Sequence, residues 1–141
     1  PLARTALYAQ GEDLHVAIWP GSRRNTEQIS RFIAQESRSY VVSVSGFMRK
    51  ADIPDDIPHA EEVITNCEEM LADGGSCLCG PDGGWIISPV TDREDLMIAS
   101  IDHTRVREER HNFDPSGHYS RPDVLRLSVN RIRQSCADFD D

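Results

Sequence analysis

The stretch Leu14–Trp19, Leu-His-Val-Ala-Ile-Trp, is a short apolar run that ends at Pro20-Gly21. Its length, its β-branched residues and the turn that follows it are typical of a buried strand. A second run of this kind, Tyr40–Ser45, lies beyond a segment with helical spacing. Because helix and strand alternate here, the sequence predicts crossover connections and neighbouring parallel or mixed strands in an α/β (α+β) fold.

The two helices of this region have recognisable boundaries. A short helix before the first strand is expected to close at Gly11, since glycine favours the left-handed conformation after a helix. Asn25 or Thr26 is predicted to cap the second helix, whose core-facing residues would be Phe32 and Ile33.

The later part of the chain contains a hairpin signal, Pro81-Asp82-Gly83-Gly84, between two short runs of strand character. The sequence therefore predicts a meander followed by a charged helix and an extended arm. The expected elements are a helix at 60–71, strands at 76–79, 85–90 and 96–101, a helix at 103–112 and a strand-like segment at 124–129.

Composition limits the classes of function. The chain has 141 residues, of which 38% are hydrophobic, as expected for one globular domain. Its formal charge of −9 argues against nucleic-acid binding, which needs a surplus of Lys and Arg. No apolar run reaches the length of a membrane span and no signal-peptide pattern opens the sequence, so a cytoplasmic location is expected.

Four cysteines, Cys67, Cys77, Cys79 and Cys136, are expected to be reduced thiols. Cys77 and Cys79 lie two residues apart in a predicted strand and would share its core face. A zinc site formed with a histidine is less favoured, because structural zinc sites show paired ligands in two knuckles. The sequence thus predicts no metal and no cofactor.

Three segments resemble the nitrilases, a family of carbon–nitrogen hydrolases. The most specific is Phe113–Val124, Phe-Asp-Pro-Ser-Gly-His-Tyr-Ser-Arg-Pro-Asp-Val. Pro1–Ser22 is similar to the segment after the family's Cys-Trp-Glu nucleophile elbow, and Gly74–Pro89 is similar to its late hairpin. Their order and spacing agree with the C-terminal half of a nitrilase.

The resemblance implies a thiol hydrolase with an α-β-β-α sandwich fold, of which this chain supplies the second half. In the family a Cys attacks the nitrile carbon, a Glu is the general base and a Lys stabilises the charged intermediate. These residues would lie upstream of Pro1. The sequence has no initiator Met, and its first residues have a helical pattern without a preceding N-cap residue. We therefore expect no catalytic residue in this chain and no activity from it alone.

Two residues match the catalytic types without matching their motifs. Cys67 is followed by Glu68-Glu69 and lies in a predicted helix rather than at a strand-to-helix elbow. Lys50 lacks the Pro-Thr and the downstream Glu of the family's lysine. We expect structural or surface roles for both.

The resemblance divides the chain into residues 1–112, the C-terminal half of the hydrolase domain, and residues 113–141, a C-terminal arm at a subunit interface. Trp19 and Pro20 are expected to bind substrate, because ligands gather at the carboxyl ends of strands in α/β sheets. Trp19 as a core aromatic is an equal alternative. The interface residues are expected to be His118, Tyr119, Arg121 and Asp123, although Arg121 and Asp123 could make only local contacts.

The sequence thus predicts part of a nitrilase that hydrolyses a nitrile to a carboxylic acid and ammonia. Its partners would be a small-molecule nitrile, the missing N-terminal half and further copies in a homo-oligomer, without nucleic acid or membrane. A truncated, non-catalytic scaffold or assembly module is one alternative. Part of a related amidase or cyanide-processing enzyme is another.

Overall fold

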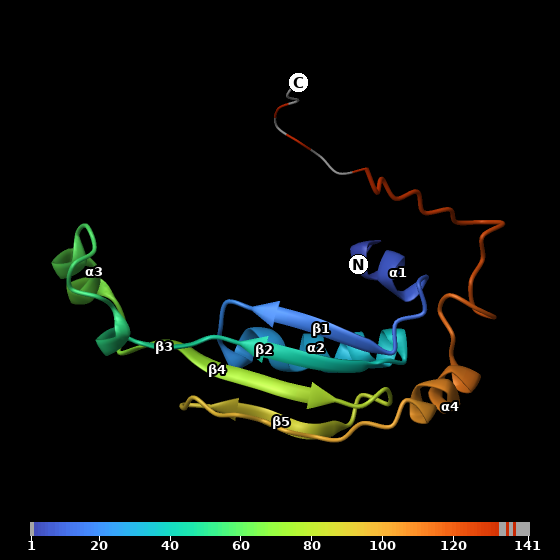
Figure 1. Ribbon diagram of the computed structural model, residues 1–141, viewed down its shortest axis with the longest axis horizontal. Helices are drawn as coiled ribbons and strands as arrows, with labels where there is room; N and C mark the ends of the chain where they lie inside the picture. The colour runs from blue at the N-terminus through green and yellow to red at the C-terminus, as the bar shows by residue number, and fades with distance from the viewer. Residues whose placement is uncertain (1, 133–134, 136, 138–141) are drawn as a thin grey trace, which may run out of the picture.

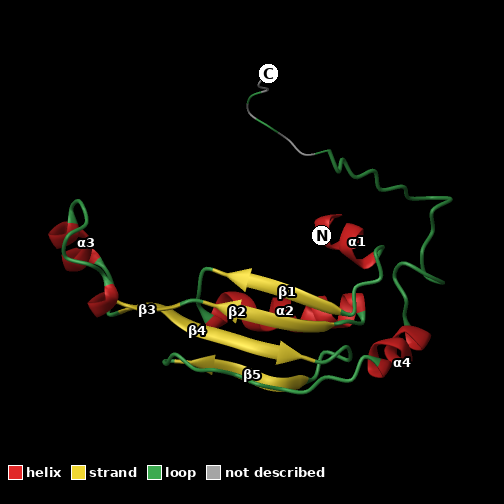
Figure 2. Cartoon of the chain, viewed as in Figure 1, coloured by secondary structure: helices red, strands yellow, loops and turns green. Residues whose placement is uncertain are grey.

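The computed structural model describes residues 2–132, 135 and 137 and contains one mixed sheet with helices beside it (Figures 1 and 2). The predicted α/β class is therefore confirmed. The elements are α1 (Leu2–Tyr8), β1 (Leu14–Trp19), α2 (Arg23–Ser37), β2 (Tyr40–Ser45), β3 (Phe47–Arg49), the 3₁₀ turn η1 (Lys50–Asp52), α3 (Ala60–Asn66), β4 (Met70–Cys79), β5 (Trp85–Thr91) and α4 (Thr104–Asn112).

The sheet is built around a parallel pair. β1 and β2 are parallel and are joined by the α2 crossover, while β4 is antiparallel to β2, β3 and β5. The strand order is β1-β2-β4-β3, with β5 paired to β4. The predicted mixed sheet is confirmed, and both strands of the parallel pair begin and end where the sequence placed them.

One face of the sheet is covered by α2, and the core lies between them. Its buried cluster is Ala17, Ile33, Ala34, Val41 and Cys79. A polar contact crosses the same layer, since Ser30 Oγ donates to Thr26 O at 2.6 Å and accepts from Ser43 Oγ at 3.0 Å. The expectation that Phe32 faces the core is wrong, because its side chain is 51% exposed and only Ile33 of that pair points inward.

The start of α2 differs from the sequence prediction. The helix begins at Arg23 with Ser22 in the N-cap position, so neither Asn25 nor Thr26 caps it. Ser22 makes no side-chain capping bond. Instead the Arg23 amide donates to Asp73 Oδ1 at 2.7 Å. The carboxylate that caps α2 thus comes from β4, fifty residues away in the sequence, which no local capping pattern reveals.

Three predicted elements of the later chain are wrong. The helix expected over 60–71 ends at Asn66, and residue 70 already belongs to β4, which extends the predicted strand in the N-terminal direction. Residues 96–101 and 124–129 form no strand. A strand requires a hydrogen-bonded neighbour, and no described segment pairs with either run. The predicted charged helix is confirmed as α4.

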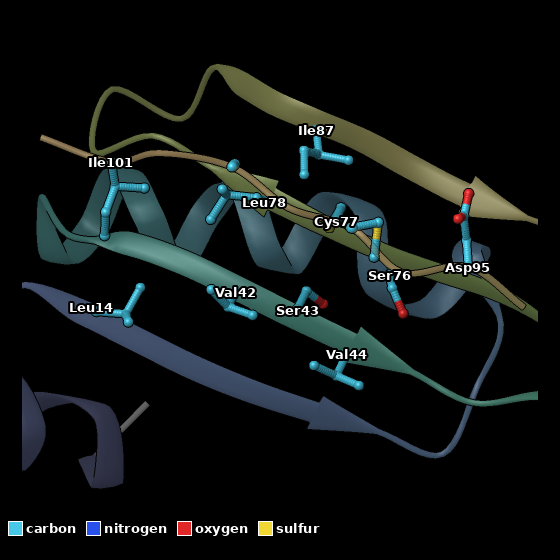
Figure 3. A pocket seen from close by; sticks show the side chains of 12 residues that line it. Leu14, Val42, Ser43, Val44, Ser76, Cys77, Leu78, Ile87, Asp95 and Ile101 are labelled. Atoms are coloured by element: carbon cyan, nitrogen blue, oxygen red, sulfur yellow. The ribbon is translucent and has the colours of Figure 1, made fainter.

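The face of the sheet opposite α2 is largely open. Val16, Ile18 and Val44 are 58%, 79% and 47% exposed on this face. The segment 95–101 crosses over the same face and leaves a cavity of about 410 Å³ beneath it (Figure 3). The molecule therefore has one covered and one half-covered apolar sheet face.

Candidate functional site

The candidate site lies where the parallel strands β1 and β2 end. Trp19 and Ser45 are the last residues of these strands and are direct partners in the register. Both side chains point toward the α2 side, where Trp19 packs partly buried against the core cluster. Polar groups of ligands commonly bind at such carboxyl ends.

Two buried polar atoms in this place lack partners. Trp19 Nε1 and Ser45 Oγ are inaccessible to solvent and have no hydrogen-bond partner among the residues that the structure describes. Buried polar atoms are nearly always hydrogen-bonded, so an orphaned pair needs an explanation. Ser45 was missed by sequence reasoning, since a serine that ends a strand carries no signal until its burial is known.

The turn after Trp19 is tightly packed. Gly46 N donates to Trp19 O at 3.3 Å, which ties the end of β1 to the end of β2. A Cβ on Gly21, whose φ is 142°, would lie 2.5 Å from Ala72 Cβ. This turn therefore requires glycine, and it holds Pro20 at the surface beside Trp19. Trp19 ends β1 and Pro20 follows it, but neither is among the residues that line the cavity in Figure 3, and their role in substrate binding stays a prediction.

The cavity itself is mostly apolar. Among the described residues, Leu14, Val42, Leu78 and Ile87 line its floor, Asp95 is the only carboxylate at its rim, and the thiol of Cys77 also belongs to the lining (Figure 3). A carboxylate and a buried thiol without a neighbouring ammonium do not reproduce the nucleophile, base and cation of a hydrolytic site. The cavity thus offers a hydrophobic surface rather than a reaction centre.

The cysteines do not form a reactive centre in the described part of the chain. Cys77 and Cys79 are 2% and 0% exposed, so their predicted core placement is confirmed. The hydrogen bond with Cys77 and burial together raise the pKa of Cys79, which keeps it a thiol. Among the described residues no group of three His, Cys, Asp or Glu side chains is placed to hold a metal ion.

The two residues of catalytic type lie away from the sheet. Lys50 belongs to η1 and Cys67 follows the last turn of α3. Both elements are in the segment that connects β3 to β4 (Figure 1). Cys67 Sγ donates to Ile64 O at 3.6 Å. The expected position of Cys67 inside a helix needs a small correction, because it is the residue after the helix end. Neither residue is at a strand-to-helix elbow.

The predicted interface residues lie on the arm that follows α4. Phe113, His118 and Tyr119 form a small aromatic group. The ring centroid of Tyr119 lies 4.9 Å from that of Phe113 and 4.8 Å from that of His118. Arg121 and Asp123 pair with each other through two hydrogen bonds of 2.8 and 2.6 Å. This is the local contact that the sequence left open as an alternative, and an intermolecular role is untested.

A further contact fixes α1 on the body. Tyr8 is 5% exposed and its hydroxyl donates to Glu36 Oε2 at 2.8 Å. Arg4 donates to the same oxygen from Nε at 3.2 Å and from its terminal nitrogen at 3.0 Å. No local sequence pattern indicates this triad, because its members come from two helices.

Comparison with curated proteins identifies the family. A bifunctional nitrilase/nitrile hydratase NIT4A of Lupinus angustifolius is 36% identical over 92% of the chain and 38% of its own length. Nitrilase 2 of Arabidopsis thaliana is 35% identical over 92% and 39%. An aliphatic nitrilase of Sinorhizobium fredii is 30% identical over 96% and 43%. No protein-family model matches the chain.

These relatives confirm the resemblance found in the sequence: over 92–99% of its length the chain is similar to curated nitrilases at 30–36% identity. It spans about two fifths of the length of the curated relatives it matches, 38–43%, which is consistent with the C-terminal part of such a protein. No described helix is long and apolar enough to cross a membrane.

Proposed function

We propose that this chain is the C-terminal part of a nitrilase that converts a nitrile to a carboxylic acid and ammonia. The supporting observation is the homology with curated nitrilases over 92–99% of the chain. The catalytic Cys, Glu and Lys would come from the part of the enzyme that this chain does not match. Residues 1–112 would complete the hydrolase domain, and residues 113–141 would form an arm at a subunit interface.

In this reaction a thiolate adds to the nitrile carbon and gives a thioimidate. One water displaces ammonia, and a second water releases the carboxylic acid and restores the thiol. The thiolate is the reactive form of the cysteine, so it needs a nearby base and a positive charge. Of the three free cysteines described here, Cys77 and Cys79 are buried and Cys67 is half-buried, so none is presented openly to a substrate. The chain by itself is therefore expected to be inactive.

Trp19 and Pro20 would form part of the wall of the nitrile pocket. Their place at the carboxyl end of a parallel strand supports this role. The orphaned Nε1 of Trp19 and Oγ of Ser45 also support it, because a bound molecule or an ordered water would satisfy both atoms. His118, Tyr119, Arg121 and Asp123 would contact another subunit of a homo-oligomer, for which their exposed position on the arm is the support.

Intact mass spectrometry of the material purified from its natural source tests this proposal. We expect a polypeptide longer than 15.8 kDa, or a second polypeptide that co-purifies with this chain, together with ammonia release from nitriles. A single species of 15.8 kDa without any partner would contradict the proposal and favour a non-catalytic module.

The products should be analysed for amide as well as acid. Several of the relatives are described as bifunctional nitrilase/nitrile hydratases, so a share of amide product is compatible with this proposal. Ammonia released from amides but never from nitriles would instead assign the enzyme to a related amidase.

A further inference from the structure

The turn between β1 and α2 has a strained backbone beside the proposed pocket wall. Ser22 has a φ of 77° and a ψ of 113°, a combination that residues with a side chain rarely adopt. Its hydroxyl makes no capping bond to the helix that follows. Such strain persists only where the surrounding structure enforces it. The contacts that enforce it here come from β4.

Asp73 makes the main contact from β4 to this turn. Its Oδ1 accepts from the backbone amide of Arg23, the residue after Ser22, at 2.7 Å. The first turn of α2 contains no acidic residue, so this carboxylate supplies the negative charge that stabilises the amino end of a helix. The backbone of Asp73 is fixed on both sides, because it pairs with Phe47 of β3 and accepts from the Asp92 amide at 2.9 Å.

Two glycines let the backbones of β4 and the turn approach closely. A Cβ on Gly75 would lie 2.8 Å from Arg23 Cα, and Gly21 packs against β4 in the same way. Free volume nevertheless lies next to this contact, since Ser22 and Asp73 both line a cavity of about 240 Å³. The strained turn therefore has space into which it can relax once the bond between Arg23 and Asp73 is lost.

We propose that Asp73 is a positioning residue for nitrile binding, because it holds the turn that carries Trp19 and Pro20. This inference rests on the proposed function and assigns a further residue to the same site. Trp19 precedes Arg23 by four residues, so a shift of the turn moves the pocket wall directly. Because Asp73 acts through the turn and not on the reacting atoms, its loss should weaken substrate binding more than it slows the chemical step.

Steady-state kinetics of a longer polypeptide, which contains this chain and the catalytic residues, tests the role of Asp73. For aliphatic and aromatic nitriles, Asp73→Ala should raise KM about 3- to 10-fold and change kcat by less than about twofold. Asp73→Asn keeps a side-chain oxygen that accepts from the Arg23 amide, so it should restore most of the wild-type KM. A fall in kcat with an unchanged KM would contradict a positioning role.

Tyr8→Phe is the matched control for a loss of stability. The Tyr8 hydroxyl donates to Glu36 Oε2 at 2.8 Å, so this variant also removes one hydrogen bond between two elements. Tyr8 belongs to α1, at the opposite end of β1 from the turn (Figure 1). Its substitution should therefore leave KM unchanged. Equal increases in KM for Tyr8→Phe and Asp73→Ala would mean that Asp73 only stabilises the fold.

A double substitution tests whether the strain at Ser22 links Asp73 to the pocket wall. Glycine adopts a positive φ without steric cost, so Ser22→Gly removes the strain that drives the turn to relax. Adding Asp73→Ala to Ser22→Gly should then raise KM by less than about twofold. An increase as large as that caused by Asp73→Ala alone would show that the two residues act independently and would overturn this route.

Hydrogen exchange separates this inference from the proposed function. The Arg23 amide should exchange slowly in the wild type and at least about tenfold faster in Asp73→Ala, whether or not the protein hydrolyses nitriles. Absence of ammonia release from nitriles by the wild-type polypeptide would contradict the proposed function, while the exchange rate would still decide whether Asp73 holds the turn. Slow exchange that persists in Asp73→Ala would overturn the inference, even in a fully active enzyme.

Discussion

Trp19 is the residue on which the substrate-binding proposal depends. In a polypeptide that contains both this chain and the catalytic residues, Trp19→Phe should raise KM for a nitrile by about 5- to 30-fold, as expected for loss of roughly 1–2 kcal/mol of pocket contact. Trp85→Phe is the control, because Trp85 also packs on the core but begins β5. Equal effects of both substitutions on KM would show that Trp19 is only a core aromatic.

Tyr8 makes stability depend on pH in the alkaline range. Burial and the hydrogen bond to Glu36 raise the pKa of Tyr8 above its usual value. The unfolded chain releases this phenolic proton near pH 10 while the folded chain keeps it. Its contribution is therefore complete below about pH 10 and is lost as pH rises further.

Urea denaturation of the wild-type chain and of Tyr8→Phe at several pH values would measure this effect. The variant should lose about 1 kcal/mol at neutral pH, the typical value of one hydrogen bond. Its free energy of unfolding should then fall less steeply between pH 9 and 11, as the sign of the pKa change requires. Identical slopes for the two proteins would exclude Tyr8 as the titrating group.

At the scale of single elements, the start of α2 provides the clearest test. Asp73→Ala removes the carboxylate that accepts from the Arg23 amide, and it should lower the free energy of unfolding by about 1 kcal/mol. Ser22→Ala should change it much less, because Ser22 occupies the N-cap position without a side-chain capping bond. Thermal or urea denaturation of both variants checks the ranking, and a larger loss for Ser22→Ala would contradict it.

The elements also show what the sequence can predict. β1 and β2 were located to the residue because both are short apolar runs closed by local turn signals, and such patterns depend only on neighbouring residues. The helical spacing of Ile29, Phe32 and Ile33 also predicts that Phe32 faces the core, and that prediction is wrong. Its exposure follows from the position of the sheet relative to α2, which is a tertiary property.

Elements that depend on distant partners were predicted less well. Residues 96–101 have the composition of a strand, yet no described neighbour pairs with them. The length of β4 was underestimated because its first half pairs with β3, a three-residue strand too short to recognise in sequence. The same holds for the candidate site. Trp19 and Pro20 can be chosen from the sequence because they end a predicted strand, whereas Ser45 is recognised only once the burial of its hydroxyl is known.

For the whole molecule, the family and the activity are separate statements. The chain is similar to curated nitrilases over nearly all of its length, while its described residues contain buried thiols and a mostly apolar cavity. On our proposal, the chain supplies scaffold and part of the pocket wall, and the catalytic residues come from the rest of the enzyme.

Ammonia release from a panel of aliphatic and aromatic nitriles tests this central claim most directly. The assay compares the 141-residue chain with a longer natural polypeptide that includes it, at equal molar concentration. We predict steady release by the longer polypeptide and none above the blank by the chain alone. Turnover by the chain alone, or no release from either protein, would contradict the account.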